Sequence, residues 1–430
     1  MNKRKDILVL GAALFSMFFG AGNLIFPPFL GRIAGDTWIF AIIGFLLTGV
    51  GLPFLGIVAS SKAGGDVDKL GRKVSPAFAK FLGITIIITI GPLLAIPRTG
   101  ATAFEMGAQP VFPNLSPIIF AIIFFAINLY FVISPSGVMD KIGKILTPGL
   151  FLLLTILIVK GVFAPIGTTV ESTLNNSFST GFLEGYQTMD ALAAILFGGV
   201  ISASLVSYGY TDEQEKMSMT IKAGVVAILG LAFVYGGLGY LGASSGNLYT
   251  ADIDRTNLIM NISNDVLGGF GKYGLGLAVM LACLTTSVGL TATAGQYFDQ
   301  ITNGKLNYRL VVVVTSVFSA VMSCIGVESI ISLAGPILAF MYPIVMVLIL
   351  LTVFLGKYIK NDNVYKYAIY AALIVSAIES LTIFGIGSGL VNLINKLPLA
   401  SSGFAWILPA LIGGVIGNFI PQKSENISAA

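Results

Sequence analysis

The chain has 430 residues, of which 56% are hydrophobic and only 10% are charged. Because soluble domains carry about 25% charged residues, this composition excludes an ordinary soluble domain and indicates an all-α integral membrane protein. The net charge of +4 argues against a nucleic-acid partner, and membrane lipids are the expected surroundings. The absence of histidine removes the commonest general base and metal ligand, and no catalytic motif is present, so we expect no enzyme.

Twelve stretches are long and apolar enough to be membrane spans, for which about 20 mainly apolar residues are needed. In chain order they are roughly 6–31, 36–60, 76–103, 115–134, 142–164, 180–208, 220–243, 273–300, 308–326, 329–355, 364–386 and 403–420. With a cytoplasmic N-terminus, 18 of the 24 lysines and arginines fall on the cytoplasmic side. This asymmetry predicts that both termini are cytoplasmic.

The first span is interrupted by residues that disfavour a helix. Gly20-Ala21-Gly22-Asn23 and the pair Pro27-Pro28 lie at membrane depth. Non-helical backbone survives there only where it is buried in protein or lines a polar cavity. The free N–H groups that begin the second half-helix suit a carboxylate, and the free carbonyls that end the first suit a small cation. The alternative is a simple kink, but Asn23 adds a polar side chain that a kink does not need.

The sixth span is also interrupted, at Thr188-Met189-Asp190. Charged residues within spans are rare and usually functional. Asp190 either caps a half-helix that begins at Ala191 or contacts a cation or a substrate ammonium group, or it carries a proton; the first role is compatible with the others.

Interruptions in spans one and six are separated by an odd number of spans, so a second repeat would be inverted in the membrane. We therefore predict one transporter domain over 1–430. It would contain a first inverted repeat at 1–164, a second at 180–355 and two extra helices at 364–420.

The eighth span is rich in hydroxyl groups, with five serines and threonines within nine residues, beginning at Thr285 and Thr286. Hydroxyl and carbonyl oxygens can bind Na⁺ without a buried charge. The alternative is hydrogen bonding to neighbouring helices or to the preceding turn of the same helix. The interrupted first span favours a cation role for Thr285 and Thr286.

Further charged residues near or within apolar spans call for an interpretation. Arg98 lies in span three, and Glu105, two turns further along the same face, could form an outer gate pair with it, but we favour an interfacial position for Arg98. Glu379 in span eleven is interpreted as a packing or oligomer contact.

The stretch from Ala13 to Pro28 resembles the N-terminal signature of the bacterial branched-chain amino acid:cation symporters, the BrnQ-type carriers. Residues 185–192 and 281–286 resemble that family too, and the likeness extends over nearly the whole chain. The resemblance implies the amino acid–polyamine–organocation superfamily and its leucine-transporter-like fold. It also implies symport of leucine, isoleucine and valine with a cation, usually Na⁺.

The resemblance also implies roles for individual residues. The N–H groups of Ala21 and Gly22 would face the substrate carboxylate, and Gly20, Asn23, Thr188 and Asp190 would complete the substrate site. The carbonyls of Ser16, Phe19 and Ala282 and the hydroxyls of Thr285 and Thr286 would bind Na⁺. Asp190 departs from the span-six pattern of relatives that bind a second Na⁺ at the position of Asn23.

The sequence therefore predicts a multi-pass symporter of the bacterial cell membrane that imports a small amino acid with Na⁺ by alternating access. Two alternatives within the same fold are coupling to H⁺, which Asp190 favours, and another solute such as a nucleobase. A lipid-modifying membrane enzyme would need clustered His, Asp or Glu residues near an interface. The oligomeric state is left open.

Overall fold

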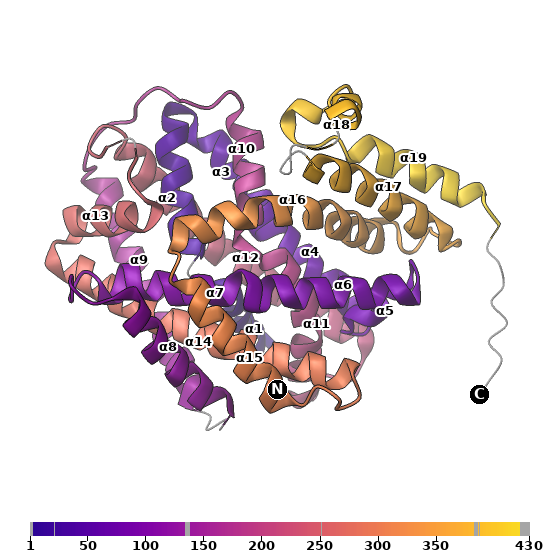
Figure 1. Cartoon of the computed structure of the whole chain (residues 1–430), viewed down its shortest axis with the longest axis horizontal. Helices are drawn as coiled ribbons and strands as arrows, with labels where there is room; N and C mark the ends of the chain where they lie inside the picture. The colour runs from indigo at the N-terminus through magenta and orange to yellow at the C-terminus, as the bar shows by residue number, and fades with distance from the viewer. Residues whose placement is uncertain are drawn as a thin grey trace. The chain divides into compact units, whose positions relative to one another are not determined.

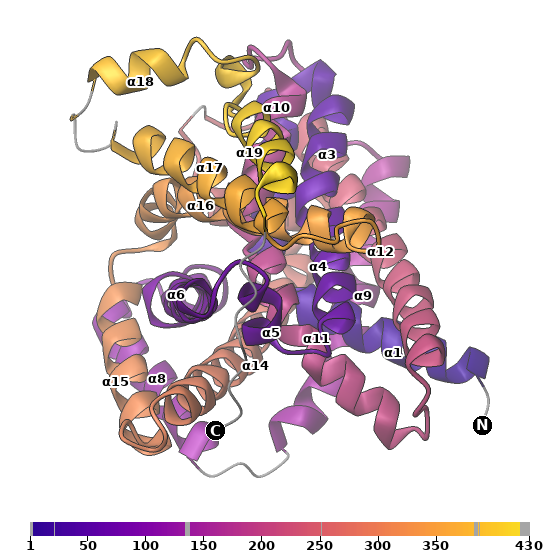
Figure 2. The same ribbon diagram turned by 90° about the vertical axis from the view of Figure 1, so that its right-hand side faces the viewer.

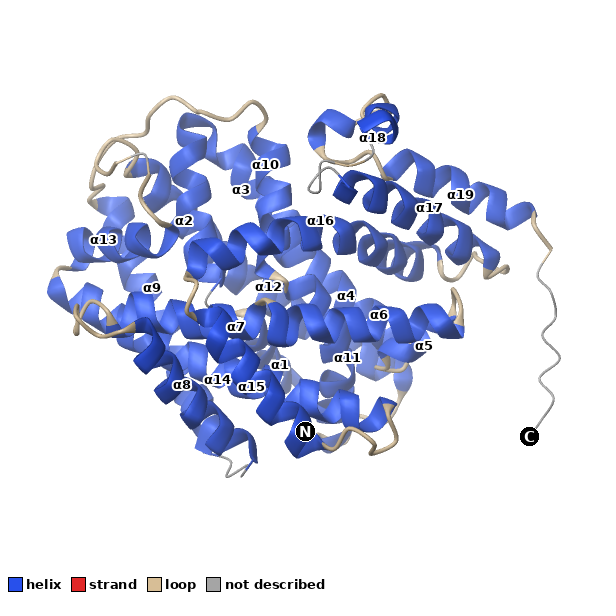
Figure 3. Cartoon of the chain, viewed as in Figure 1, coloured by secondary structure: helices blue, strands red, loops and turns tan. Residues whose placement is uncertain are grey.

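The protein consists of helices joined by turns and loops in this computed structural model of the whole chain (Figure 3). The structure describes residues 3–20, 22–133, 138–250, 252–381, 386 and 388–421, with the backbone alone over 138–145 and at 388. No strand occurs among these residues. The all-α prediction is confirmed for this part of the chain.

The first five predicted spans correspond to helices or to runs of shorter helices (Figure 1). The helices over this part of the chain are α1 Lys3–Phe18, α2 Gly22–Ala34, α3 Trp38–Leu46, α4 Leu52–Lys62, α5 Val67–Arg72, α6 Pro76–Ile88, α7 Ala95–Thr102, α8 Pro117–Ile133 and α9 Val138–Phe163. Of these, α5 lies between the second and third predicted spans. Short 3₁₀ or π-helical turns connect several of them: η1 Gly35–Thr37, η2 Leu47–Gly51, η3 Thr89–Leu93 and η4 Ala103–Ala108.

The remaining predicted spans also correspond to helices. The helices over this part of the chain are α10 Ser177–Glu184, η5 Gly185–Thr188, α11 Asp190–Ser207, α12 Glu213–Ser244, α13 Arg255–Leu267, α14 Gly269–Ile301, α15 Tyr308–Ser323, α16 Val327–Leu350, η6 Leu351–Leu355, α17 Asn363–Ser380, α18 Ser388–Ile394, η8 Ala400–Ser402 and α19 Ile407–Phe419. Of these, α13, α18 and η8 lie between the predicted spans. Within the described residues, seven helical stretches are long and apolar enough to cross a membrane. Shorter apolar helices lie at Pro117–Ile133, Tyr308–Ser323 and Ile407–Phe419, so twelve crossings stay a prediction.

The chain divides into two compact units that do not follow the order of the sequence. The first unit contains Met1–Gly51, Thr85–Ala193 and Ser218–Gly335, and the second contains Leu52–Ile84, Ala194–Met217 and Pro336–Ala430. Both predicted interruptions and the hydroxyl-rich part of α14 lie within the first unit. The bounds proposed for the two inverted repeats stay a prediction.

In the first unit, α2 crosses α12 so closely that only glycine fits at the contact. A Cβ atom on Gly31 would lie 1.9 Å from the carbonyl oxygen of Gly239, and one on Gly242 would lie 1.8 Å from that of Pro28. Small residues let helix backbones approach in membranes, where packing rather than the hydrophobic effect joins helices. This crossing fixes the second half of the interrupted first span against α12.

In the second unit, α17 and α19 lie side by side (Figures 1 and 2). Glycines again permit the approach, since a Cβ atom on Gly417 would lie 2.3 Å from the carbonyl oxygen of Asn363. The Asn361 side chain donates hydrogen bonds to the carbonyls of Gly417 at 3.1 Å and Ile420 at 2.6 Å, which satisfies free carbonyls near the end of α19.

Span three contains an irregularity that the sequence analysis did not anticipate. Gly91 has a non-helical ψ of −119° within the π-helical turn η3, and Pro92 follows it directly. A second π-helical turn, η4, ends the span. The turn at Gly91 separates α6 from α7, which carries Arg98.

Candidate functional site

The first interruption lies where it was predicted. Helix α1 ends at Phe18 and α2 begins at Gly22. Between them, the backbone N–H of Asn23 donates to the carbonyl of Gly20 at 3.2 Å. Ala21 lies outside the described residues, so its predicted N–H contact with the substrate stays a prediction. Gly22 and Asn23 form the first turn of α2, where backbone N–H groups have no partner within their own helix.

The second interruption is a single turn of 3₁₀ helix followed by a strained residue. Helix α10 ends at Glu184, and Met189 adopts a left-handed conformation with φ of 62°. This conformation costs about 1–2 kcal/mol for a residue other than glycine. The Thr188 hydroxyl stabilises the turn, because it donates to the Gly185 carbonyl at 3.0 Å and accepts from the Asp190 amide at 3.3 Å.

Asp190 does not cap a helix that begins at Ala191. Helix α11 already begins at Asp190, and the Asp190 carboxylate is bound by another helix. The Asn23 side chain donates to Asp190 Oδ2 at 2.7 Å, although the two residues are 167 positions apart. The N-cap prediction is therefore wrong, because the side chain points toward the first interruption rather than toward the amides of its own helix.

Asn23 joins three elements in the interior of the first unit. Besides its bond to Asp190, the side-chain amide of Asn23 donates to the Phe18 carbonyl at 2.8 Å and contacts the hydroxyl of Tyr235 on α12. Asn23, Asp190 and Tyr235 are 1%, 7% and 0% exposed. A buried polar network of this kind stabilises one geometry when its groups are paired. Tyr235 was missed by the sequence analysis, because a tyrosine in an apolar span usually packs in the core.

Arg98 is also buried at the two interruptions, which contradicts the predicted interfacial position. Arg98 is only 5% exposed, and its Nη1 donates a hydrogen bond to the Gln187 carbonyl at 2.6 Å. The guanidinium lies over the Phe26 ring, 5.4 Å from its centroid. Its Nη2 lies close to Gly22, since a Cβ atom there would be 2.7 Å away.

The alternative gate pair of Arg98 and Glu105 is wrong as well. Glu105 accepts from the Thr256 hydroxyl at 2.7 Å and from the Val327 amide at 2.9 Å. The signal for Arg98 was present in the sequence, because a charged residue within a span is usually functional. What the sequence lacked was the inward direction of the side chain.

Thr285 and Ala282 are joined by a hydrogen bond to the preceding turn of the same helix, which was the alternative to a cation role. The Thr285 hydroxyl donates to the Ala282 carbonyl at 2.9 Å, within its own helix. This bond uses the hydroxyl hydrogen, while the lone pairs of both oxygens can still accept a cation. On α1, the Ser16 hydroxyl shares a 2.8 Å hydrogen bond with that of Thr147 on α9. The cation roles of Ser16, Phe19, Ala282, Thr285 and Thr286 stay predictions.

A charged cluster that the sequence analysis missed joins α10, α13 and α16. Arg255 forms ion pairs with Glu328 at 2.5 Å and with Glu184 at 3.4 Å, and its guanidinium stacks 4.0 Å from the centroid of the Phe29 ring. The three charged residues come from distant parts of the sequence, so their spacing gives no signal.

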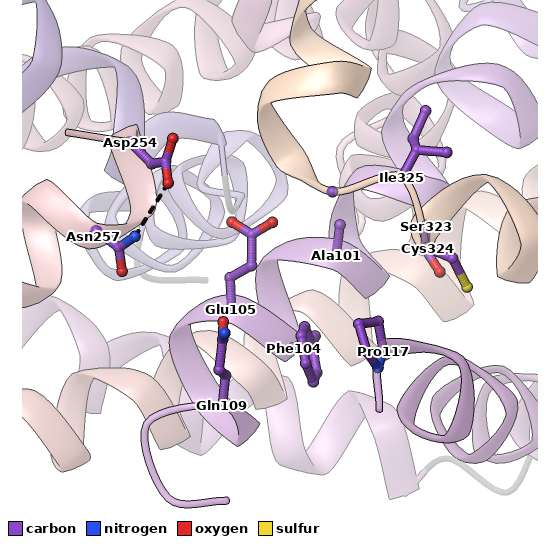
Figure 4. A pocket seen from close by; sticks show the side chains of 11 residues that line it. Ala101, Phe104, Glu105, Gln109, Pro117, Asp254, Asn257, Ser323, Cys324 and Ile325 are labelled. Carbon is purple, nitrogen blue, oxygen red and sulfur yellow. Dashed lines mark hydrogen bonds between the residues drawn. The ribbon is translucent and has the colours of Figure 1, made fainter. Parts of the chain in front are cut away.

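A cavity of about 280 Å³ lies near this cluster in the first unit (Figure 4). Glu105 from η4, Asp254 and Asn257 from the start of α13 and Ile325 line it, with an Asn257–Asp254 hydrogen bond at 3.2 Å. None of the predicted substrate or cation residues lines this cavity. Its polar walls therefore belong to a region distinct from the Asn23–Asp190 contact.

Two solved structures of transporters share the fold. "Inward facing conformation of Mhp1" matches with a TM-score of 0.62 and 11% identity, over 96% of this chain and 90% of that one. "Crystal structure of MhsT in complex with L-phenylalanine" matches with a TM-score of 0.57 and 15% identity, over 95% and 96%. These matches confirm the predicted leucine-transporter-like fold.

Sequence comparisons give a family. The branched-chain amino acid permease BraB of Bacillus subtilis is 41% identical over 98% of both chains. The permease BrnQ of the same organism is 37% identical over 96% of both chains. The family model described as "Branched-chain amino acid transport protein" matches residues 3–424. Together with its many apolar helices, these matches show that the chain is a multi-pass membrane transporter, not an enzyme, and belongs to the branched-chain amino acid transport protein family.

Proposed function

We propose that this chain imports leucine, isoleucine and valine across the bacterial cell membrane, coupled to Na⁺ by alternating access. The relatives BraB and BrnQ are named as branched-chain amino acid permeases, which supports the substrate class. The observation that carries the proposal is the hydrogen bond between Asn23 and Asp190, which joins the interruptions of two helices at one buried point. Discontinuous helices of this kind form the substrate sites of secondary transporters.

In this proposal the amino acid binds as a zwitterion at the joined interruptions. The N–H groups at the start of α2, from Ala21 and Gly22, bind the carboxylate, because a helix N-terminus carries partial positive charge. Asp190 binds the ammonium group, and Asn23 and Thr188 keep the Asp190 carboxylate and the turn before it in place.

Na⁺ supplies the driving force by binding more tightly to one conformation of the transporter than to the other. Carbonyls of Ser16 and Phe19 on the first span and oxygens of Ala282, Thr285 and Thr286 on α14 bind it. Ligands from two helices would fix the distance between them. Substrate binding would then permit closure of the site.

Uptake of radiolabelled leucine by proteoliposomes tests both the substrate and the ion. We expect accumulation when Na⁺ is high outside, and none with K⁺ in its place at equal pH on both sides. Accumulation driven by a proton gradient without Na⁺ would replace Na⁺ coupling with H⁺ coupling, for which Asp190 is the candidate proton carrier. Absence of leucine uptake under either gradient would overturn the proposal, and a competition panel that includes nucleobases would then identify the solute.

Thr285→Ala is expected to raise the Na⁺ concentration for half-maximal uptake by at least about tenfold, because the Na⁺ ion loses one oxygen ligand. The measurement is the initial rate of leucine uptake against Na⁺ concentration. Thr293→Ala is the matched control, since the half-buried Thr293 makes the same kind of bond, to the Gly289 carbonyl at 2.9 Å, but this bond is exposed whereas that of Thr285 is partly buried. Equal Na⁺ activation of both variants would reject Thr285 as a ligand.

A further inference from the structure

We propose that three lysines of the second unit, Lys62, Lys73 and Lys357, bind the headgroup of an anionic phospholipid. These residues are called the lysine cluster below. The inference goes beyond the proposed function and does not depend on which solute or ion the protein carries. In the sequence, the three lysines contributed only to the charge asymmetry that predicts the orientation of the chain.

A buried tyrosine brings two of the lysines together. Lys73, which directly follows α5, places its Nζ 3.3 Å from the hydroxyl oxygen of Tyr365 and 4.9 Å from the centroid of its ring. The same hydroxyl lies 3.5 Å from the place of a Cβ atom on Gly356, the residue before Lys357. Tyr365 on α17 is 2% exposed, so it forms a fixed floor beneath this part of the cluster.

The third lysine reaches the same segment from α4. Lys62 is the last residue of that helix, and its Nζ donates to the carbonyl of Val353 in η6 at 2.8 Å. The charge of Lys62 is repelled by the charges of both Lys73 and Lys357. Lys62 and Lys357 are exposed and Lys73 is half-buried, so a molecule from outside the protein can reach them.

The described residues supply no carboxylate to balance these charges. The partners of Lys62 and Lys73 are a carbonyl, a hydroxyl and an aromatic ring, and among the described residues no ion pair joins the cluster to an acidic side chain. Two nearby acids are used elsewhere, because Asp68 pairs with Arg72 at 2.5 Å and Asp66 accepts from the backbone N–H of Asp68 at 2.9 Å. A phosphate group would replace repulsion among the lysines with charge-assisted hydrogen bonds.

The lysine cluster lies at the ends of membrane-crossing stretches. Lys62 ends the apolar stretch Gly22–Lys62, and Lys357 follows the stretch Val327–Leu355 by two residues. Phospholipid headgroups surround a chain at this level. Lysines directly beside a membrane-crossing helix, on the side predicted here to be cytoplasmic, attract anionic lipids.

Exposed aromatic residues beside Lys357 favour a lipid over a dissolved anion. Phe354 is 59% exposed and Tyr358 is 79% exposed, although both are large and largely apolar. Tyrosine rings are enriched at the headgroup level of membranes, and phenylalanine suits the acyl chains. A free phosphate ion would use neither side chain, whereas a phospholipid offers a partner to both and to the lysines.

The rival explanation is that these lysines only orient the neighbouring spans. Orientation depends on how many positive charges lie near the span ends, and not on whether they meet at one point. A headgroup needs the meeting point, because one phosphate must reach several side chains. The two explanations therefore differ in which lysines affect lipid binding.

The test uses an introduced tryptophan as a local reporter. Tyr358→Trp places it beside the lysine cluster, and the unsubstituted protein gives the background fluorescence of Trp38 and Trp406. The purified full-length protein is placed in nanodiscs of phosphatidylcholine, which is replaced stepwise by phosphatidylglycerol with bromine, a fluorescence quencher, on its acyl chains. A parallel series with brominated phosphatidylcholine gives the reference, so the two series yield a relative binding constant.

We expect the relative binding constant to favour phosphatidylglycerol about 100-fold, since each lysine at a membrane surface contributes about fivefold. Lys62→Gln combined with Lys357→Gln should reduce this preference to about fivefold. Equal quenching by both lipids with the cluster intact would overturn the inference. Relief of the quenching when inorganic phosphate replaces chloride at equal ionic strength would also overturn it, because the cluster would then bind a free anion.

Lys222→Gln combined with Lys305→Gln is the matched control. It removes the same charge from two exposed lysines on the side predicted to be cytoplasmic, outside the cluster, and should leave the preference unchanged. An equal loss in both double variants would overturn the inference, because total charge alone would then decide lipid binding. Lys62→Arg combined with Lys357→Arg keeps the charge and should keep most of the preference; its loss there would contradict a role for the positive charges.

Discussion

Asp190→Asn is expected to raise the KM for leucine uptake about 100-fold. Asparagine keeps the size of the side chain and can still accept from Asn23, but it removes the negative charge that we assign to the substrate ammonium group. Loss of one partner of a buried charge pair costs about 2–5 kcal/mol. The measurement is the initial rate of leucine uptake by proteoliposomes against leucine concentration, at saturating Na⁺ and with a proton gradient as a second condition.

Glu379→Gln is the control for this variant, because it removes a carboxylate from another apolar helix, α17, in the second unit. We expect its KM to equal that of the wild type. A wild-type KM in Asp190→Asn would contradict the assignment of Asp190 to the substrate. If Asp190→Asn instead loses only the uptake that a proton gradient drives, Asp190 carries the coupling proton and does not bind the substrate ammonium group.

Gly242→Ala is expected to destabilise the protein by about 1–3 kcal/mol or more, the usual cost of overpacking a well-filled interior. The added Cβ atom would lie 1.8 Å from the carbonyl oxygen of Pro28 and 2.7 Å from its Cα atom. These are backbone atoms, so α2 and α12 must separate to make room. Thermal unfolding in detergent should therefore begin at a temperature several degrees lower than for the wild type.

Gly236→Ala on the same helix separates this packing effect from the intrinsic preference for alanine. A Cβ atom on Gly236 would meet nothing within 4 Å. Alanine is favoured over glycine within a helix by about 0.5–1 kcal/mol, so this variant should be as stable as the wild type or slightly more so. An equal loss of stability in both variants would show that the crossing of α2 and α12 does not limit stability.

The positions of both helix interruptions could be predicted because they depend on local chemistry. Gly20, Gly22 and Asn23 disfavour a helix wherever they occur, and a carboxylate such as Asp190 is costly within a span unless it has a partner. The apolar length of each segment predicted the helical regions for the same reason. These features need no knowledge of the neighbouring helices.

The partners across the fold could not be predicted. Arg98 is buried where α7 packs against α14 and α15, and this packing is not visible in the hydrophobic pattern. Tyr235 becomes part of the site because it reaches Asn23 from α12, more than 200 residues further along the chain. The Arg255 cluster likewise depends on contacts between distant segments. The surroundings of these residues depend on tertiary contacts, whereas the helix interruptions depend on local sequence chemistry.

The hydrogen bond between Asn23 and Asp190 has a consequence for biosynthesis. Its two partners are 167 residues apart, and translation adds about 5–20 residues per second. Asn23 is therefore synthesised roughly 10–30 s before Asp190. During that interval the Asn23 side chain has the Phe18 carbonyl, five residues before it, but neither Asp190 nor Tyr235 as a partner. The polar contacts between the two interruptions can therefore be completed only after α12, which carries Tyr235, has been made.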